Sequence, residues 1–472
     1  MPTGIETKPR PSPMPSTGTV LAWKPSRYTV RVQDESKRWL VYNSMTGAIG
    51  AVPKDREGEI LPLLRDGFKG TLMGQAKQLA DRGFLVPEYA DEDLRAQLLK
   101  QRRQSARGLH LILMPTEECN FRCNYCYEDF ARGAMDRNTR KGVKNLVAKS
   151  LASLDRLDVN WFGGEPLEEI GIIEELSQYM IAATRAKGIP YSANIVTNGY
   201  HLDRRNLRTL VDCGVSRIQV TVDGLPDQHD AKRVRKDGGA TFARIWENLR
   251  AAKKAPYRFH MAIRVNFDPK TLADLEPFLR RLVDEFAGDD RFSVFFRPVG
   301  HWGGDNDENV EICTGVAANS AEYESTRKAQ AMGLQSAGTY PFLRPGGSIC
   351  YAANPNSFVV GADGTLYKCT VALDKDFNKI GRLHADGTMV IDDDKFALWV
   401  TSDDSKDAVC QSCVFRPACQ GASCPLVRIE SGRRPCPTPK KQLRRSLITV
   451  WEHFEKFGRL EPANASGLGI AD

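Results

Sequence analysis

The sequence predicts an α/β protein built on a partial (β/α)6 barrel, with a winged-helix-like module before the barrel and a cysteine-rich domain after it. Three observations predict this fold class. Apolar strand patterns alternate with helical patterns through residues 109–305, short strands and two helices follow one another within residues 20–90, and ten of the twelve cysteines fall into two groups.

Composition limits the classes of protein to consider. The 472 residues are 41% hydrophobic and 26% charged, which is typical of a globular protein with a large core. The longest apolar runs, such as Leu111–Met114, are too short to cross a bilayer, so we expect no membrane partner. A net charge of +7 without a zinc-finger spacing or a basic stripe argues against nucleic acid as a partner.

The first hundred residues predict a tail, a small module and a linker. Residues 1–19 are rich in Pro, Ser and Thr and lack an apolar core, so we expect a disordered tail rather than a signal peptide, and a cytoplasmic location. The charged residues 91–108 predict a linker helix. Between them, residues 20–90 predict a winged-helix-like module, with strands at 28–32 and 39–42, helices at 57–65 and 74–82, and a closing extended piece at 83–86.

Residues 109–305 predict the barrel. Each strand is followed by a helical segment, and this alternation requires a parallel sheet whose chemistry lies at the carboxyl ends of the strands. The expected strands lie near 110–114, 159–162, 191–196, 217–222, 259–265 and 292–296. The expected helices lie near 137–154, 172–187, 203–213, 241–253 and 272–286.

The remainder of the chain predicts three segments. Residues 306–347 show no clear periodicity and are expected to be a connecting segment. Residues 348–440 are loop-rich and dense in cysteine, so metal is expected to replace a large core there. Residues 441–472 predict a C-terminal helix and a tail.

The first cysteine group, Cys119-x3-Cys123-x2-Cys126, follows the first barrel strand. A reducing compartment disfavours disulfides, so clustered thiols indicate metal. Three thiolates this close can hold three irons of a cubane cluster and leave the fourth iron open to a small molecule. The alternative is a zinc knuckle that lacks one ligand, because no histidine lies nearby to complete a tetrahedral site.

This group resembles the signature of the radical SAM superfamily, including an aromatic residue, Tyr125, before the last cysteine. The resemblance implies a [4Fe-4S] cluster that binds S-adenosylmethionine (SAM) and reduces it to methionine and a 5′-deoxyadenosyl radical. Further matching positions follow the second, third and fourth strands, and an arginine lies downstream of them. The resemblance thus implies these cofactor-binding residues: Tyr125, Gly163, Gly164, Glu165, Pro166, Asn198, Thr221, Asp223 and Arg233.

The second cysteine group closely resembles the SPASM domain, which carries two auxiliary [4Fe-4S] clusters. The resemblance implies one cluster on Cys410, Cys413, Cys419 and Cys436, and another on Cys350, Cys369 and Cys424. The family's usual fourth cysteine before Cys350 is missing, so the second of these has an open iron unless Cys313 completes it. Four residues instead of three separate Cys419 from Cys424, which a loop should absorb. Two structural zinc sites are the alternative.

The module at residues 20–90 resembles the PqqD-like recognition element of peptide maturases, on Leu40–Gly47, Ile60–Leu64 and Gly83–Val86. The resemblance implies that an edge strand pairs with the leader of a precursor peptide. A DNA-binding winged helix is the competing interpretation.

Together these resemblances imply a radical SAM/SPASM maturase of a ribosomally made peptide, supplied with electrons by a flavodoxin- or ferredoxin-type donor. Thioether crosslinking of a cysteine is the favoured reaction, because an open iron could hold the sulfur of the substrate. Carbon–carbon crosslinking, epimerisation and formylglycine formation remain open. A redox-sensing DNA-binding regulator is the alternative from another class.

Overall fold

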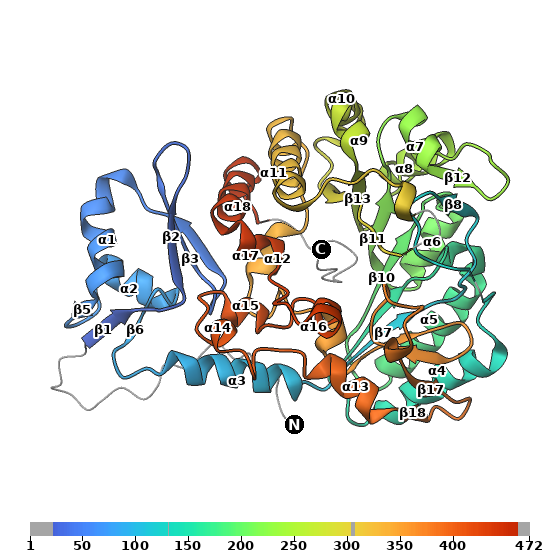
Figure 1. The fold of residues 1–472 in the computed structure, drawn as a ribbon, viewed down its shortest axis with the longest axis horizontal. Helices are drawn as coiled ribbons and strands as arrows, with labels where there is room; N and C mark the ends of the chain where they lie inside the picture. The colour runs from blue at the N-terminus through green and yellow to red at the C-terminus, as the bar shows by residue number, and fades with distance from the viewer. Residues whose placement is uncertain (1–21, 131, 304–306, 461–472) are drawn as a thin grey trace.

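A computed structural model describes residues 22–130, 132–303 and 307–460 (Figure 1). The tails expected at residues 1–19 and after residue 460 lie outside this range. Figure 1 shows a large curved sheet with helices along its outer side, C-terminal helices on its inner side, and the N-terminal module apart from the sheet. In the described part of the chain, no helix is both long enough and apolar enough to cross a membrane.

The barrel sheet has its six predicted strands in parallel. They run in the order β14-β13-β11-β10-β9-β7, so each strand lies next to the one that precedes or follows it in the barrel. Their bounds are β7 Gly108–Leu113, β9 Arg156–Trp161, β10 Tyr191–Thr197, β11 Val215–Thr221, β13 His260–Phe267 and β14 Phe292–Pro298. The prediction of a parallel α/β sheet is confirmed.

The predicted helices between these strands are present, with two corrections: α7 (Pro226–Lys232) was not predicted, and one predicted helix is divided. The segment 272–286 was expected to be one helix, but it belongs to two, because Asp268 caps a short first helix at the Thr271 amide and Asp274 separates it from the second. The helices are α4 Arg137–Ser150, α5 Ile170–Arg185, α6 Arg204–Asp212, α7 Pro226–Lys232, α8 Phe242–Lys253, α9 Pro269–Ala273 and α10 Leu275–Phe286.

The cysteine-rich region continues the barrel sheet, which corrects the expectation that it is mainly loops. Strand β15 (Ser357–Val360) pairs in parallel with β7, and three antiparallel strands extend the sheet to ten. These strands are β16 Thr365–Tyr367, β17 Lys379–Leu383 and β18 Met389–Ile391. Strands of three to five residues carry little periodic signal, and pairing with an existing sheet stabilises them.

A second correction concerns the connecting segment 306–347. It contains the 17-residue helix α11 (Gly315–Ala331), whose buried positions include small residues such as Ala318, Ser325 and Ala329. Without large apolar residues at helical spacing, the sequence pattern did not indicate it. The remaining C-terminal helices are α12 Thr339–Leu343, α13 Asp393–Val400, α14 Ala408–Gln411, α15 Arg416–Cys419, α16 Pro425–Ser431, α17 Thr438–Lys441 and α18 Leu443–Phe457.

The N-terminal module contains two three-stranded sheets and two helices. One sheet has the order β2-β3-β4 and the other β5-β1-β6, and α3 (Glu92–Gln104) connects the module to the barrel. The other elements are β1 Ala22–Pro25, β2 Thr29–Gln33, β3 Trp39–Asn43, β4 Ala48–Ala51, α1 Glu57–Asp66, β5 Phe68–Lys69, α2 Gly74–Asp81 and β6 Leu85–Pro87.

The module packs against the C-terminal region through a shared apolar core. Leu40 and Tyr42 of β3 are buried with Phe415 and Leu447, and the Tyr42 hydroxyl donates to the Leu343 carbonyl oxygen at 2.5 Å. A buried core of this kind fixes the module to the cysteine-rich region.

Candidate functional site

The first cysteine group lies in the loop that follows β7, at the carboxyl end of the barrel strands. Within this loop β8 (Phe121–Cys123) pairs antiparallel with β12 (Arg233–Arg235), which places Arg233 opposite Cys123. Burial, followed by Glu128 and Cys123, raises the pKa of Cys126 to about 12. Burial, Glu165 and Cys123 likewise raise the pKa of Cys119. Cys119 and Cys126 therefore each lie within electrostatic range of Cys123.

Gly163 and Gly164 hold this loop against the end of β9. Gly163 has φ +120, and a Cβ there would overlap the Thr116 carbonyl oxygen. A Cβ at Gly164 would overlap the carbonyl group of Glu118, whose oxygen accepts a hydrogen bond from the Glu165 amide at 2.9 Å. The two glycines thus allow close approach of two backbones. Their predicted contact with a cofactor stays a prediction.

The side chain of Glu165 connects the ends of the second and third strands. Its buried carboxylate accepts from the Thr197 hydroxyl at 2.7 Å, the Asn198 amide at 2.7 Å and the Leu167 amide at 3.0 Å. Burial raises the pKa of Glu165 to about 7, and these hydrogen bonds oppose the rise. Pro166 is buried and begins the short helix that follows.

Tyr125, Asp223 and Arg233 form one hydrogen-bonded group beside Cys123. The Tyr125 hydroxyl donates to the Asp223 carboxylate and accepts from Arg233 Nη1 at 2.6 Å and from Asn266 Nδ2 at 3.2 Å. The Asn266 amide donates to Asp223 Oδ1 at 2.9 Å. Although burial acts to lower it, Cys123, Tyr125 and Asp223 raise the pKa of Arg233 well above its ordinary value. Arg233 is therefore a cation.

Arg233 keeps one donor without an acceptor. The side chain is 7% exposed, and among the described residues its Nε has no hydrogen-bond partner. A buried guanidinium donor in this condition costs free energy unless a ligand satisfies it. A carboxylate is well suited to do so. The chain's own residues therefore fit the carboxylate of an amino acid beside the first cysteine group.

The other predicted contacts lie at neighbouring strand ends. Asn198 donates from Nδ2 to Asn120 Oδ1 at 2.7 Å and to Cys119 Sγ at 3.9 Å. Thr221 is buried at the end of β11, in register with Arg264. Sequence analysis did not identify Asn120 or Asn266 as site residues. Their positions were a usable signal, because Asn120 lies inside the cysteine motif and Asn266 lies at the end of the fifth strand.

The seven C-terminal cysteines form two separate groups. Burial raises the pKa of Cys350 well above its ordinary value, and Cys424 and Cys369 add to that effect. In the other group, burial raises the pKa of Cys419 to about 12 with contributions from the remaining three: Cys413, Cys410 and Cys436. The thiols that influence one another are those that the resemblance groups together, and their role as cluster ligands stays a prediction.

Cys313 lies apart from both groups. Burial and Asp268 raise its pKa, and no cysteine of the described chain contributes to that shift. This position gives no support to Cys313 as a fourth ligand beside Cys350.

A site for a single metal ion is not found among the residues that the structure describes. Across the described residues, no three His, Cys, Asp or Glu side chains are arranged to hold one ion. A zinc ion with Zn–S bonds of about 2.3 Å would need its thiolates within about 4 Å of one another. A cubane binds each thiolate to a different iron and so holds the sulfurs further apart.

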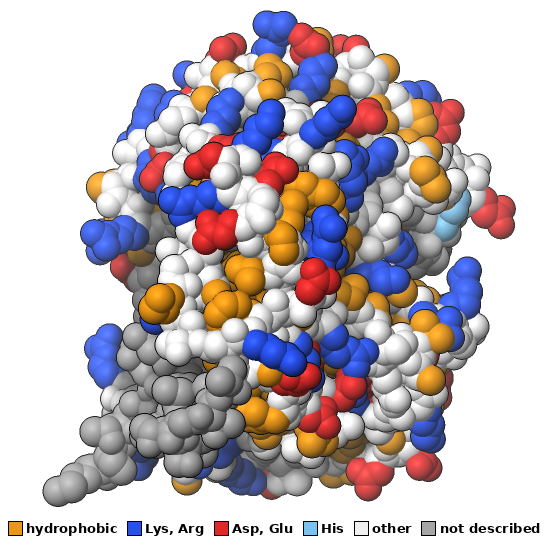
Figure 2. Space-filling model, turned by 90° about the vertical axis from the view of Figure 1, so that its left-hand side faces the viewer, with side chains coloured by type: hydrophobic (Ala, Val, Ile, Leu, Met, Phe, Trp, Pro, Cys, Tyr) orange, Lys and Arg blue, Asp and Glu red, His pale blue; other side chains and the backbone are white. Residues whose placement is uncertain are grey.

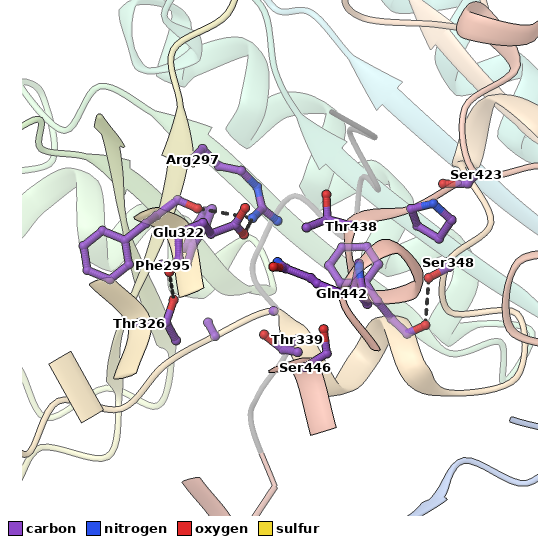
Figure 3. A pocket seen from close by; sticks show the side chains of 16 residues that line it. Phe295, Arg297, Glu322, Thr326, Thr339, Ser348, Ser423, Thr438, Gln442 and Ser446 are labelled. Atoms are coloured by element: carbon purple, nitrogen blue, oxygen red, sulfur yellow. Dashed lines mark hydrogen bonds and ion pairs between the residues drawn. The ribbon is translucent and has the colours of Figure 1, made fainter. Parts of the chain in front are cut away.

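A pocket, whose empty space of about 660 Å³ includes open solvent, lies between the sixth barrel strand and the C-terminal region (Figure 3). On one side Arg297 forms an ion pair with Glu322 (Figure 3). The other sides carry hydroxyl, amide and ring groups, among them Ser348, Ser423 and Gln442. Ser348 and Ser423 stand two and one residues from Cys350 and Cys424, and Pro437 follows Cys436, so both C-terminal thiol groups are close in sequence to the pocket lining.

The pocket is also connected to the first cysteine group. Arg297 lies opposite Asn266 in the register of β14 and β13, and Asn266 donates to the Tyr125 hydroxyl. Arg297 also helps to lower the pKa of Arg264, after burial, while Tyr125 acts to raise it. Arg297 of the pocket therefore lies one strand away from the Asn266 side chain that contacts Tyr125.

Comparison with known proteins agrees with these features. Residues 113–282 match the family model of the Radical SAM superfamily. The chain is 27% identical over 288 residues to a GTP 3′,8-cyclase of Microcystis aeruginosa, a match spanning 55% of this chain and 80% of that enzyme. A GTP 3′,8-cyclase of Klebsiella pneumoniae is 31% identical over 152 residues, 31% of this chain and 43% of that enzyme, so the chain spans less than half of this second relative.

The fold is similar to two solved structures. Native anSMEcpe with bound AdoMet and Cp18Cys peptide has a TM-score of 0.51 at 16% identity, over 74% of this chain and 96% of that one. Streptococcus suis SuiB bound to precursor peptide SuiA has a TM-score of 0.50 at 14% identity, over 87% of this chain and 97% of that one. At these identities the likeness concerns the fold alone.

Proposed function

We propose that this chain, a radical SAM enzyme by its domain at residues 113–282, modifies a peptide. The observation that carries the proposal is the pocket, whose Arg297 lies one strand from the Asn266–Tyr125 contact and whose Ser348 and Ser423 are close in sequence to Cys350 and Cys424. A radical generated at one side and a metal cluster at the other would both reach the same bound substrate. The substrate is a ribosomally synthesised precursor peptide.

The chain's residues have distinct roles towards the cofactors. Cys119, Cys123 and Cys126 would hold the first [4Fe-4S] cluster, which with SAM supplies the 5′-deoxyadenosyl radical. Arg233 would orient the SAM carboxylate through its unpaired Nε. Tyr125 would hold Arg233 in place through the 2.6 Å hydrogen bond. The two C-terminal thiol groups would hold the two auxiliary [4Fe-4S] clusters.

The charge of the pocket favours a peptide over a nucleotide. Of the residues that line it, Arg297 is the one Lys or Arg, and Glu322 neutralises it. A nucleoside triphosphate carries several negative charges and needs a matching set of cations. A neutral wall of hydroxyl and amide groups instead suits the backbone of an extended peptide.

A GTP-cyclising enzyme is the second candidate, since the chain resembles GTP 3′,8-cyclases over its barrel. That resemblance covers 55% of this chain in the Microcystis comparison. The solved structures with the same fold include SuiB bound to precursor peptide SuiA, over 87% of this chain. The wider coverage of this chain by the SuiB comparison supports a peptide as the substrate.

Thioether formation is the favoured reaction. The position of Cys313 near Asp268 supports an open iron on the cluster of Cys350, Cys369 and Cys424. An open iron could ligate a cysteine of the peptide for attack by a carbon radical. Carbon–carbon crosslinking, epimerisation and formylglycine formation are the alternatives within the same class.

The N-terminal module would recognise the leader of the precursor, as a PqqD-like element does. Its two three-stranded sheets offer edge strands for backbone pairing. On the face that Figure 2 shows, Lys and Arg are intermingled with Asp and Glu, whereas a DNA-binding surface is dominated by cations. This mixture supports a peptide partner over the regulator hypothesis. A flavodoxin- or ferredoxin-type donor and a cytoplasmic location complete the proposal.

The test is an anaerobic incubation of the reconstituted enzyme with SAM, dithionite and either a small peptide encoded beside it or GTP. Mass spectrometry should find 5′-deoxyadenosine and a peptide that has lost two hydrogens, with a cysteine blocked to alkylation. Cys424→Ser should abolish the peptide product and leave SAM cleavage intact. Cys213 is a buried thiol outside the three groups, so the control Cys213→Ser should leave both the peptide product and SAM cleavage intact. A cyclised GTP with an unchanged peptide would refute the proposal.

A further inference from the structure

We propose that an exposed basic surface beside the thiol group Cys410/Cys413/Cys419/Cys436 docks an acidic one-electron carrier protein. We call this surface the basic face and define it as Lys406, Arg433, Arg434, Lys440 and Lys441. The inference rests on the proposed cluster at these cysteines, but not on the identity of the substrate.

This thiol group is the one whose position suits exchange with an outside protein. Three of its four thiols, Cys410, Cys413 and Cys436, are partly exposed, whereas in the Cys350 group only Cys424 is, and Cys350 and Cys369 are 6% and 8% exposed. The two groups therefore differ in exposure, and the Cys410 group is the one closer to solvent.

The charge around this group is concentrated. Residues 428–445 contain seven basic side chains and one acidic side chain, and Cys436 lies among them. Arg433, Arg434 and Lys441 are exposed, and the Arg434 side chain retains 49% of its surface. Across the whole chain the excess of basic residues is 66 to 59, so this segment is far more basic than the rest.

Contacts connect the basic face directly to the thiols. Arg434 Nε donates to the Asp407 carboxylate at 2.9 Å, and Arg428 Nη1 donates to the same carboxylate at 3.2 Å. Arg428 Nη2 then donates to Cys410 Sγ at 3.7 Å and to the Gly421 carbonyl oxygen at 3.1 Å. Two side chains, Asp407 and Arg428, thus connect the exposed Arg434 to Cys410, a ligand of the proposed cluster.

An acidic electron carrier fits this combination better than another anionic partner. Cations steer an acidic protein to the surface, and the partly exposed thiol group beneath them gives a redox partner a short path. In the transfer the reduced carrier loses one electron and the cluster gains it, with no proton or group moved. A nucleic acid or an acidic peptide would also bind the basic face, but it would not exchange an electron with a cluster at these thiols.

The experiment uses the reconstituted full chain and reduced flavodoxin as the probe, without SAM or peptide. Stopped-flow absorbance measures the second-order rate constant of cluster reduction at low and high salt. The test variant is R433E/K441E. The matched control is R185E/K187E, two exposed cations on and just after α5, with the same change in charge. Iron content and the visible spectrum check that every variant carries its clusters.

We expect R433E/K441E to lower the rate at low salt by about tenfold or more and high salt to reduce this difference, while the control keeps the wild-type rate. Equal rates in both variants would overturn the proposal. So would an unchanged flavodoxin rate together with lost binding of a leader peptide or of DNA. Because no substrate is present, the result stands even if the enzyme acts on GTP.

Discussion

Replacing Gly164 by alanine tests how the cysteine loop is positioned. The added Cβ would lie 2.5 Å from the carbonyl carbon of Glu118, whereas nonbonded carbons rest about 3.5 Å apart. The loop that carries Cys119 must therefore move by about 1 Å, and the hydrogen bond from the Glu165 amide to Glu118 is disturbed. Overpacking of this kind costs about 1–3 kcal/mol of stability.

The functional effect should exceed the effect on stability. A displacement of about 1 Å at a reacting group can cost about 100-fold in rate, so Gly164→Ala should lower SAM cleavage by about that factor. Loss of the first cluster would also remove about a third of the iron bound to the chain. The assays are 5′-deoxyadenosine formation by liquid chromatography and iron content per chain.

Gly171→Ala is the matched control. Gly171 is exposed in α5, and a Cβ there would meet no atom within 4 Å. Alanine at this site should leave SAM cleavage unchanged and stabilise the helix by about 0.5–1 kcal/mol. If Gly164→Ala retained full iron and wild-type SAM cleavage, the reasoning that β9 positions the cysteine loop through backbone contact would be refuted.

Three further predictions concern single side chains. Tyr125→Phe removes the hydroxyl that accepts from Arg233 at 2.6 Å, so the Kd for SAM, measured by calorimetry on the reconstituted enzyme, should rise about tenfold, and an unchanged Kd would contradict this role. Lys368→Met leaves unpaired the carbonyl oxygens of Asn354 and Ser357, which Lys368 Nζ contacts at 2.6 Å, so the chain should lose about 3 kcal/mol; a Tm equal to that of the wild type in calorimetry would count against it. Burial lowers the pKa of His110 to about 4, below the value of about 6.5 in the unfolded chain. As the pH drops from about 6.5 to 4, the unfolded state therefore binds a proton that the folded state does not, and the free energy of unfolding falls. His110→Asn should therefore remove about 2 kcal/mol of the stability difference between pH 7 and pH 5 in urea titrations, whereas the exposed His384→Asn should leave that difference intact.

The barrel could be predicted because each of its strands carries its own apolar pattern. Segments such as Leu111–Met114 are buried on both faces and read as continuous apolar runs, and the helices between them bury one stripe each. Caps reinforce these patterns, as where Asp136 accepts from the Thr139 amide at the start of α4. Local signals and the global fold agree in this part of the chain.

The parts that escaped prediction depend on contacts distant in sequence. Strand β15 forms because it pairs with β7, roughly 250 residues earlier, as in the pair Ser357–His110. Helix α11 packs small residues against its neighbours and shows no apolar stripe. Among the site residues, Asn266 was missed because its role appears only when the end of β13 meets the cysteine loop. The site therefore depends on tertiary register as well as on motif spacing.

The pairing of β15 with β7 also constrains movement during turnover. The Met114 amide donates to the Val360 carbonyl oxygen at 3.1 Å, and His110 Nδ1 contacts Ser357 Oγ at 2.8 Å. One hydrogen-bonded ladder therefore runs from the strand before Cys119 to β15, which lies between Cys350 and Cys369 in the sequence. A hinge between these two regions would break several of its rungs at once. The span between them is consequently set by the fold, and a substrate must adjust its own conformation to bridge it.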